Sequence, residues 1–131
     1  MKGFVVRNEQ LDRFRNEKEE ELARVIRNDL ERNHPQTTQG LSPAIMAYRI
    51  RTGIDRARTH GLSKQYAVAM FVELMFLIGP DFDEYPPFKA TLRRKDLKPD
   101  DRIDVLVAET TERQWQNARL RYNPAAWGVP A

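Results

Sequence analysis

The chain of 131 residues contains no cysteine and only two histidines, His34 and His60. Without a thiol it can form neither a disulfide, nor a zinc-thiolate site, nor a thiol nucleophile. The histidines fall at the ends of different predicted helices, and no His-x-x-x-His, Gly-x-Ser-x-Gly or glycine-rich phosphate loop is present. We therefore expect no metal, no cofactor and no enzymatic activity. His60, near a helix C-terminus, is interpreted as a cation that stabilises the helix dipole.

Long apolar runs are also missing. The longest, Tyr66 to Ile78, is shorter than the ~20 apolar residues that a membrane helix needs. The opening run, Phe4 to Val6, is too short for the apolar region of a signal peptide. The net charge is +3, and the 31% of charged residues include both signs, which is typical of a solvated helical surface. We expect a cytoplasmic protein that does not enter a membrane, folded as one domain over residues 1–131.

The run from Tyr66 to Ile78 is the predicted centre of the fold. It carries a single charge, Glu73, so no face of a helix made from it can meet water. Alanine, methionine and leucine outnumber β-branched residues, which favours a helix over a buried strand. Ser63 and Gly79-Pro80 bound it as start and stop signals. We predict a central helix at about 64–78, with these core residues: Val68, Phe71, Val72, Met75 and Phe76.

A long first helix is predicted from Asn8, its N-cap, to about Asn33. Apolar residues at helical spacing predict the stripe that faces the core: Leu11, Phe14, Leu22, Val25, Ile26 and Leu30. The polar segment 34–41 that follows is predicted to be a loop. Ser42 and Pro43 then begin a second helix, which ends where Gly61 takes a left-handed C-cap. This helix and the central one are expected to pack against each other at an angle.

The C-terminal third predicts a short helix from Pro87 to about Arg94 and a last helix from Pro99 or Asp100 to about Arg121. The last helix is expected to turn these residues inward: Ile103, Leu106, Val107, Thr110 and Ala118. The tail, 122–131, is either an arm laid on the bundle or a mobile end, because Pro124 and Gly128 break a helix. The predicted fold is all-α: a compact bundle of four main helices and one short helix around the central one, preceded by a lead at 1–7.

Glu73 is the most anomalous residue, because a carboxylate inside a buried helix must be paired, hydrogen-bonded or protonated. The cations of the second helix are nearest, and Arg49 and Arg56 are the expected partners. A structural buried pair is the favoured interpretation, since a catalytic acid would need a second carboxylate in a cleft.

The acidic residues Asp81, Asp83 and Glu84 have a spacing similar to that of a calcium loop. An EF-hand loop needs a central glycine and a distal glutamate in register, and both are missing. Hydrogen bonds that cap turns explain these carboxylates better.

A basic set could form a nucleic-acid face: Arg49, Arg51, Arg56, Arg58, Lys64, Lys89, Arg93, Arg94, Lys95, Lys98 and Arg102. The tight turn between the second and central helices could also mimic a helix-turn-helix. The fit is poor, because a recognition helix must expose polar residues and the central helix is the most apolar in the chain. Nucleic-acid binding is kept as an alternative.

One segment, about Gly53 to Pro86, resembles a known pattern. Its matching residues are Gly53, Ile54, Arg56, Ala57 and Gly61, then Met75, Phe76, Gly79, Pro80, Asp81, Phe82 and Asp83. They are similar to small helical accessory proteins encoded beside bacterial type VI secretion genes. The resemblance covers less than a third of the chain. It implies an accessory protein that is encoded near spike proteins or toxin effectors and acts through protein contacts, with no established active site to carry over.

The expected protein-binding residues are Phe82, Asp83, Tyr85 and Trp127. The loop from Phe82 to Phe88 is rich in aromatics and stiffened by two prolines, so little entropy is lost on docking, and Trp127 offers a second anchor. The alternative is that these aromatics only cover the ends of the bundle. The expected function is an adaptor or chaperone for a type VI effector or spike, and the alternative is an immunity protein that neutralises a toxin.

Overall fold

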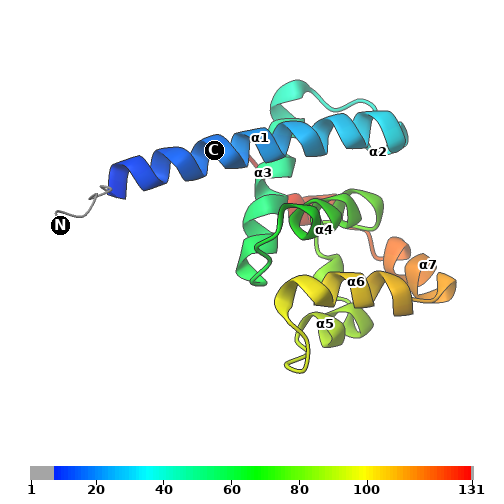
Figure 1. Ribbon diagram of the computed structural model, residues 1–131. Coiled ribbons are helices and arrows are strands. Elements are labelled where there is room, and N and C mark those ends of the chain that lie inside the picture. Colours follow the sequence, from blue (N-terminus) through cyan, green and yellow to red (C-terminus); the bar gives the residue numbers. More distant parts are fainter. Residues whose placement is uncertain (1–7, 131) are drawn as a thin grey trace, which may run out of the picture.

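The structure is a computed structural model that describes the backbone of residues 8–130 and the side chains of residues 17–130. In chain order, its elements are α1 (Asn8–Asn33), α2 (Pro35–Thr38), α3 (Pro43–Thr59), α4 (Gln65–Leu77), η1 (Phe82–Glu84), α5 (Pro86–Leu92), α6 (Pro99–Glu109), α7 (Glu112–Leu120) and η2 (Pro124–Trp127). The described part contains no strand, so the all-α prediction is confirmed (Figure 1). The predicted lead, 1–7, lies outside the described residues.

Helix α4 lies in the middle of the core, as its composition predicts. All five of its predicted core residues are buried, and Phe71 is fully enclosed. Burying such a side chain stabilises the fold by about 1.5–3 kcal/mol. Helix α3 packs directly on α4, because a Cβ placed on Gly53 would lie 3.0 Å from both γ-carbons of Val72. Gly53 therefore lets the two backbones approach closely.

The connection between α3 and α4 is shaped by Gly61 and by a distant carboxylate. Gly61 has a φ of 83°, the left-handed conformation predicted for it, and Leu62 folds back into the core. Ser63 does not act as a helix cap through its own side chain. The Asp100 carboxylate at the start of α6 accepts hydrogen bonds from the backbone N–H groups of Ser63, at 2.8 Å, and Lys64, at 3.2 Å. The start of α6 therefore holds the two residues that precede α4.

Helix α1 packs on the core through its second half. Leu22, Ile26 and Leu30 are buried, whereas Val25 is 55% exposed, so its predicted place in the core is wrong. Val25 lies about 100° around the helix from Ile26, beyond the edge of the buried stripe. In Figure 1 the first half of α1 extends past the rest of the chain. The core positions predicted for Leu11 and Phe14 fall outside the described side chains.

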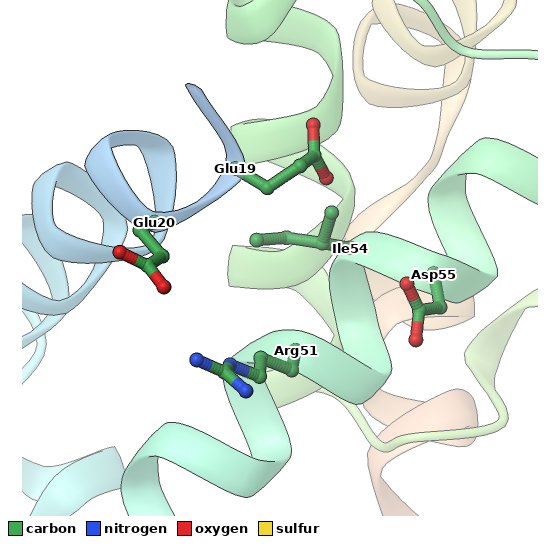
Figure 2. A pocket seen from close by; sticks show the side chains of 5 residues that line it. All are labelled: Glu19, Glu20, Arg51, Ile54 and Asp55. Carbon is green, nitrogen blue, oxygen red and sulfur yellow. The ribbon is translucent and has the colours of Figure 1, made fainter. Parts of the chain in front are cut away.

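A groove runs between α1 and α3, which we call the α1–α3 groove. It consists of three adjoining cavities of about 330, 220 and 130 Å³. Glu20 and Arg51 line both of the larger two, and Arg27 lines both of the smaller two. Figure 2 shows its largest cavity, where Glu20 and Arg51 point into the space between the helices and Ile54 lies between Glu19 and Arg51.

The predicted last helix is two helices. It breaks after Glu109 because Thr111 forms a capping box: its hydroxyl accepts from the Gln114 N–H at 3.2 Å, and Gln114 Oε1 accepts from the Thr111 N–H at 3.0 Å. The reorientation leaves Val107 39% exposed, although it was predicted to face inward, and Thr110 only partly buried. The predicted pattern is confirmed at the buried positions: Ile103, Leu106 and Ala118.

Two shorter segments also differ from their predictions. The predicted loop at 34–41 contains the single turn α2, which Pro35 begins. Helix α5 begins one residue earlier than predicted, at Pro86, and ends at Leu92. Counting α2 and the division of the last helix, the described part of the chain has seven α-helices where the sequence predicted five.

Candidate functional site

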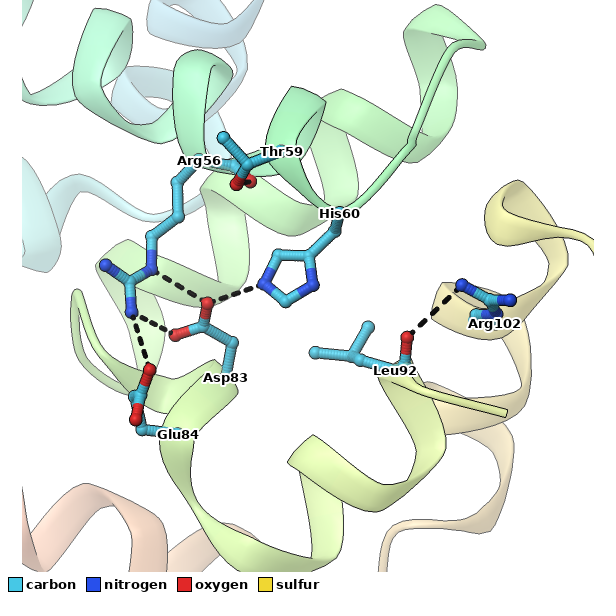
Figure 3. A network of polar contacts seen from close by, with 7 residues as sticks. All are labelled: Arg56, Thr59, His60, Asp83, Glu84, Leu92 and Arg102. Atoms are coloured by element: carbon cyan, nitrogen blue, oxygen red, sulfur yellow. Dashed lines mark hydrogen bonds and ion pairs between the residues drawn. The ribbon is translucent and has the colours of Figure 1, made fainter. Parts of the chain in front are cut away.

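The strongest polar cluster joins the end of α3 to the loop after α4 (Figure 3). The Arg56 guanidinium donates through Nε to Asp83 Oδ2 at 2.8 Å and through its terminal nitrogen to Oδ1 at 2.7 Å. His60 Nε2 lies 2.7 Å from Oδ2, and the Arg56 guanidinium also reaches Glu84 at 3.6 Å. The Asp83 side chain is only 4% exposed. We call this set the Arg56–Asp83–His60 cluster.

Asp83 is held ionised by its neighbours. Burial acts to raise the pKa of its carboxyl, but hydrogen bonds from His60 and Arg56 outweigh burial and hold that pKa below its usual value. An ionised carboxylate is an acceptor only, so the His60 Nε2 atom carries the proton of their shared hydrogen bond. The cluster therefore fixes the direction of the His60 ring. The ring packs on Phe71, with 5.2 Å between centroids.

The cluster lacks the remaining parts of a hydrolytic triad among the described residues. The hydroxyl of Thr59, the residue before His60, donates to the Arg56 carbonyl at 2.6 Å instead of to the histidine. Both Asp83 oxygens are already occupied. These contacts hold the C-terminus of α3 against η1. This structural role accounts for the geometry of the cluster.

Glu73 has a different partner from the ones the sequence suggested. Burial, and after it the nearby carboxyl of Asp29 on α1, raises the pKa of Glu73 to about 7. Two carboxyls that share a site cannot both ionise cheaply, so one proton is retained between them. The predicted pairing with Arg49 or Arg56 is wrong, because Arg56 binds Asp83 and Arg49 lies elsewhere.

Arg49 stacks on Trp127, its guanidinium carbon 5.4 Å from the ring centroid. Trp127 is 2% exposed, packs on Phe76 and donates through Nε1 to the Tyr122 hydroxyl at 3.2 Å. The tail is thus an arm laid on the bundle, and Trp127 cannot serve as an exposed anchor. Phe82 is buried as well, at 3%. For both residues the alternative interpretation, that they cover the ends of the bundle, is the correct one.

Part of the predicted binding region does remain accessible. A cavity of about 140 Å³ lies between the loop after α4 and the end of α7, with Tyr85 and Arg121 in its wall and Phe82 in its lining. The Arg121 guanidinium stacks on the Tyr85 ring at 5.3 Å, and the Tyr122 ring rests on Gly79 and stays 41% exposed. We call this region, defined by Gly79, Tyr85, Arg121 and Tyr122, the loop–α7 surface.

Much of the basic set is engaged in internal contacts. Arg58 pairs with Glu19 at 2.6 Å, and Arg94 pairs with Asp96 at 2.6 Å. Arg102 donates to the Arg94 carbonyl at 2.7 Å, and the Leu92 carbonyl lies within its reach at the end of α5 (Figure 3). These cations are committed to the fold, which weakens the case for a basic face that binds nucleic acid.

The residues that carry the family resemblance have clear structural roles. Gly53 permits the contact between α3 and α4, Arg56 and Asp83 form the buried pair, and Gly61 adopts a left-handed turn. Phe82 packs on Phe71 with 4.9 Å between centroids. The resembling segment therefore specifies how α3, α4 and the following loop pack.

Sequence reasoning missed four residues that organise the site: Asp29, Asp100, Arg121 and Tyr122. Each contacts a residue that is distant in the chain or lies beyond the end of a helix, so no local sequence pattern indicates the contact. The only available signal was compositional, since tyrosine and arginine beside each other in a breaker-rich tail are residues that often anchor interfaces.

Within the described residues, no helix has both the length and the apolar character that crossing a membrane requires. No protein-family model, no curated protein and no solved structure matches the chain.

Proposed function

We propose that this chain is a protein-binding accessory factor, an adaptor or chaperone for a type VI secretion effector or spike protein that acts in the cytoplasm. The family resemblance gives the class of partner. The observation that carries the proposal is the loop–α7 surface, which is accessible and close to the segment that bears the resemblance.

Its composition suits protein recognition. Tyrosine and arginine are the residues most often found at the energetic centre of interfaces, and this surface presents two tyrosines with one stacked arginine. Leu120, adjacent in the chain, adds an apolar side chain that is 84% exposed.

The surface is also held rigidly, which lowers the entropic cost of docking. Tyr85 precedes two prolines, its ring packs edge-on against Phe88 at 5.2 Å, and Tyr122 is tied to the buried Trp127. A partner would meet side chains that are already in place.

Binding is tested with a double variant, Leu120→Glu with Arg121→Glu, used as bait in cells of the native host. Both side chains are exposed, so the variant should fold. The matched control is Val25→Glu with Arg32→Glu, which makes the same changes of charge on an exposed face of α1. We expect the control to retain an effector or spike protein as the wild type does, and the double variant to lose it. Equal capture by both variants would remove the loop–α7 surface from the proposal.

An adaptor and an immunity protein are separated by a genetic test. Deleting the gene of an adaptor should abolish export of its effector and leave the producing cell healthy. Deleting the gene of an immunity protein should leave export intact and poison the producing cell. Normal export and normal growth after deletion would argue against both roles.

A further inference from the structure

The α1–α3 groove separates charge along its length. Its first cavity is lined by three carboxylates, Glu19, Glu20 and Asp55, against one cation, Arg51. Glu19 is already paired with Arg58, so Glu20 and Asp55 carry the acidic character of this end. The next cavity is lined by three cations, Arg24, Arg27 and Arg51, against Glu20. One end of the groove is therefore acidic and the following stretch basic.

Such a surface complements itself when a second copy is placed antiparallel to it. A twofold axis makes each contact occur twice, and the acidic end of one copy meets the basic stretch of the other. Antiparallel helices also set opposite ends of their dipoles side by side.

The shape of α1 gives a second, independent indication. Its first half leaves the rest of the chain (Figure 1), while its second half is packed through Leu22, Ile26 and Leu30. A helical segment of a few turns is marginal in water unless it packs on something. In an antiparallel pair, the projecting half of each α1 lies along the packed half of the other.

We propose that the chain forms a twofold-symmetric dimer in which the α1 helices of two copies lie antiparallel across the α1–α3 groove. This places the loop–α7 surface outside the contact, so the dimer presents it twice.

The charge pattern sets the register. With the axis level with residue 22 of α1, residues whose numbers sum to 44 face each other. Glu20 then faces the second copy's Arg24, and Glu17 faces the second copy's Arg27. All four side chains are exposed, and all lie within about 80° on one side of the helix, the side of the groove. The small side chain of Ala23 lies beside them in the lining of the groove and allows close approach.

The same residues could be satisfied within one helix, because Glu20 and Arg24 are four residues apart. Arg27 and Glu31 show such a pair, at 4.0 Å. The experiment must therefore distinguish pairing between copies from pairing within one.

The test uses two single charge reversals in the full chain, Glu20→Arg and Arg24→Glu, with sedimentation velocity as the readout. The wild type should be dimeric, and each variant alone should dissociate at least about tenfold more readily, since two attractive contacts become repulsive. Mixing the two variants should restore a heterodimer, because the cations of the Glu20→Arg copy then face the carboxylates of the Arg24→Glu copy at both contacts. The mixed variants place like charges within each helix, so intrahelical pairing cannot produce this rescue.

The double variant, Glu20→Arg with Arg24→Glu, should also be dimeric, and circular dichroism of each variant checks that it folds. A wild type that stays monomeric overturns the proposal. Two other results would also overturn it: single variants that dimerise as readily as the wild type, or single variants that form no heterodimer when they are mixed. The assay uses only this chain, so its outcome does not depend on the proposed effector or spike partner.

Discussion

Replacing Asp83 with asparagine tests the cluster that joins α3 to the loop after α4. The side chain keeps its size and one oxygen, but the new amide group presents hydrogens to Arg56 and His60, which are themselves donors. At least one of the three short contacts to Asp83 is lost, and the guanidinium keeps only the exposed Glu84 carboxylate, at 3.6 Å, as a charged partner.

The expected loss follows from burial. Removing one partner of a buried ion pair costs about 3–5 kcal/mol. Arg56 retains 32% exposure and can regain water, which places the loss near the lower end, at about 3 kcal/mol. A domain of this size is stable by about 5–15 kcal/mol, so this is a large fraction. At about 3–4 °C per kcal/mol for a chain of intermediate length, the melting temperature should fall by about 10 °C.

The pH dependence of the free energy of unfolding gives a second test of the same cluster. Because the pKa of Asp83 is lower in the folded than in the unfolded chain, its stabilisation is present above the ordinary value of 3.8 and is lost as the pH falls through the folded pKa. Urea unfolding followed by circular dichroism should show the full difference between wild type and variant near neutrality. The difference should shrink in acid.

The matched control is Glu84→Gln, since Glu84 reaches the same guanidinium but is 64% exposed. This change should alter stability by less than about 0.5 kcal/mol. If Asp83→Asn lowers the free energy of unfolding no more than Glu84→Gln does, the cluster does not hold α3 against η1.

Three further changes probe other parts of the fold, all by denaturant or thermal unfolding. Because the pKa of Glu73 is raised to about 7, its stabilisation is complete below its ordinary pKa of 4.5 and is lost as the pH rises through about 7. Glu73→Gln should flatten this dependence, and a slope equal to that of the wild type would argue against a raised pKa at Glu73. Trp127→Ala should cost about 3–5 kcal/mol because the ring is buried on Phe76, whereas a loss below about 1 kcal/mol would mean that the tail is not packed. Asp100→Ala should cost about 1–2 kcal/mol because the backbone N–H groups of Ser63 and Lys64 lose their shared acceptor, and no loss would show that water replaces the carboxylate.

Periodicity and composition predicted the architecture well because those signals are local. The thirteen residues around Phe71 leave no polar face, so a buried helix follows directly. The break between α6 and α7 was missed because Thr110 and Thr111 are tolerable inside a helix. The reciprocal hydrogen bonds between Thr111 and Gln114 are what begin a new helix at this point.

The polar partners were predicted poorly for a physical reason. Glu73 required a partner, but composition cannot tell an arginine from a second carboxyl, since protonation satisfies the same requirement. Trp127 was misplaced because a breaker-rich tail normally indicates exposure, while the neighbouring Tyr122 and the distant Arg49 enclose this ring. The loop–α7 surface depends on contacts between distant segments, which the sequence does not reveal.

Hydrogen exchange on the complex with a captured effector or spike protein tests the proposed binding role most directly. We predict slower amide exchange in residues 79–85 and 118–122 when the partner is bound, with α6 (Pro99–Glu109) unchanged. Protection confined to α6, or exchange in residues 79–85 and 118–122 that is the same with and without the partner, would contradict the account.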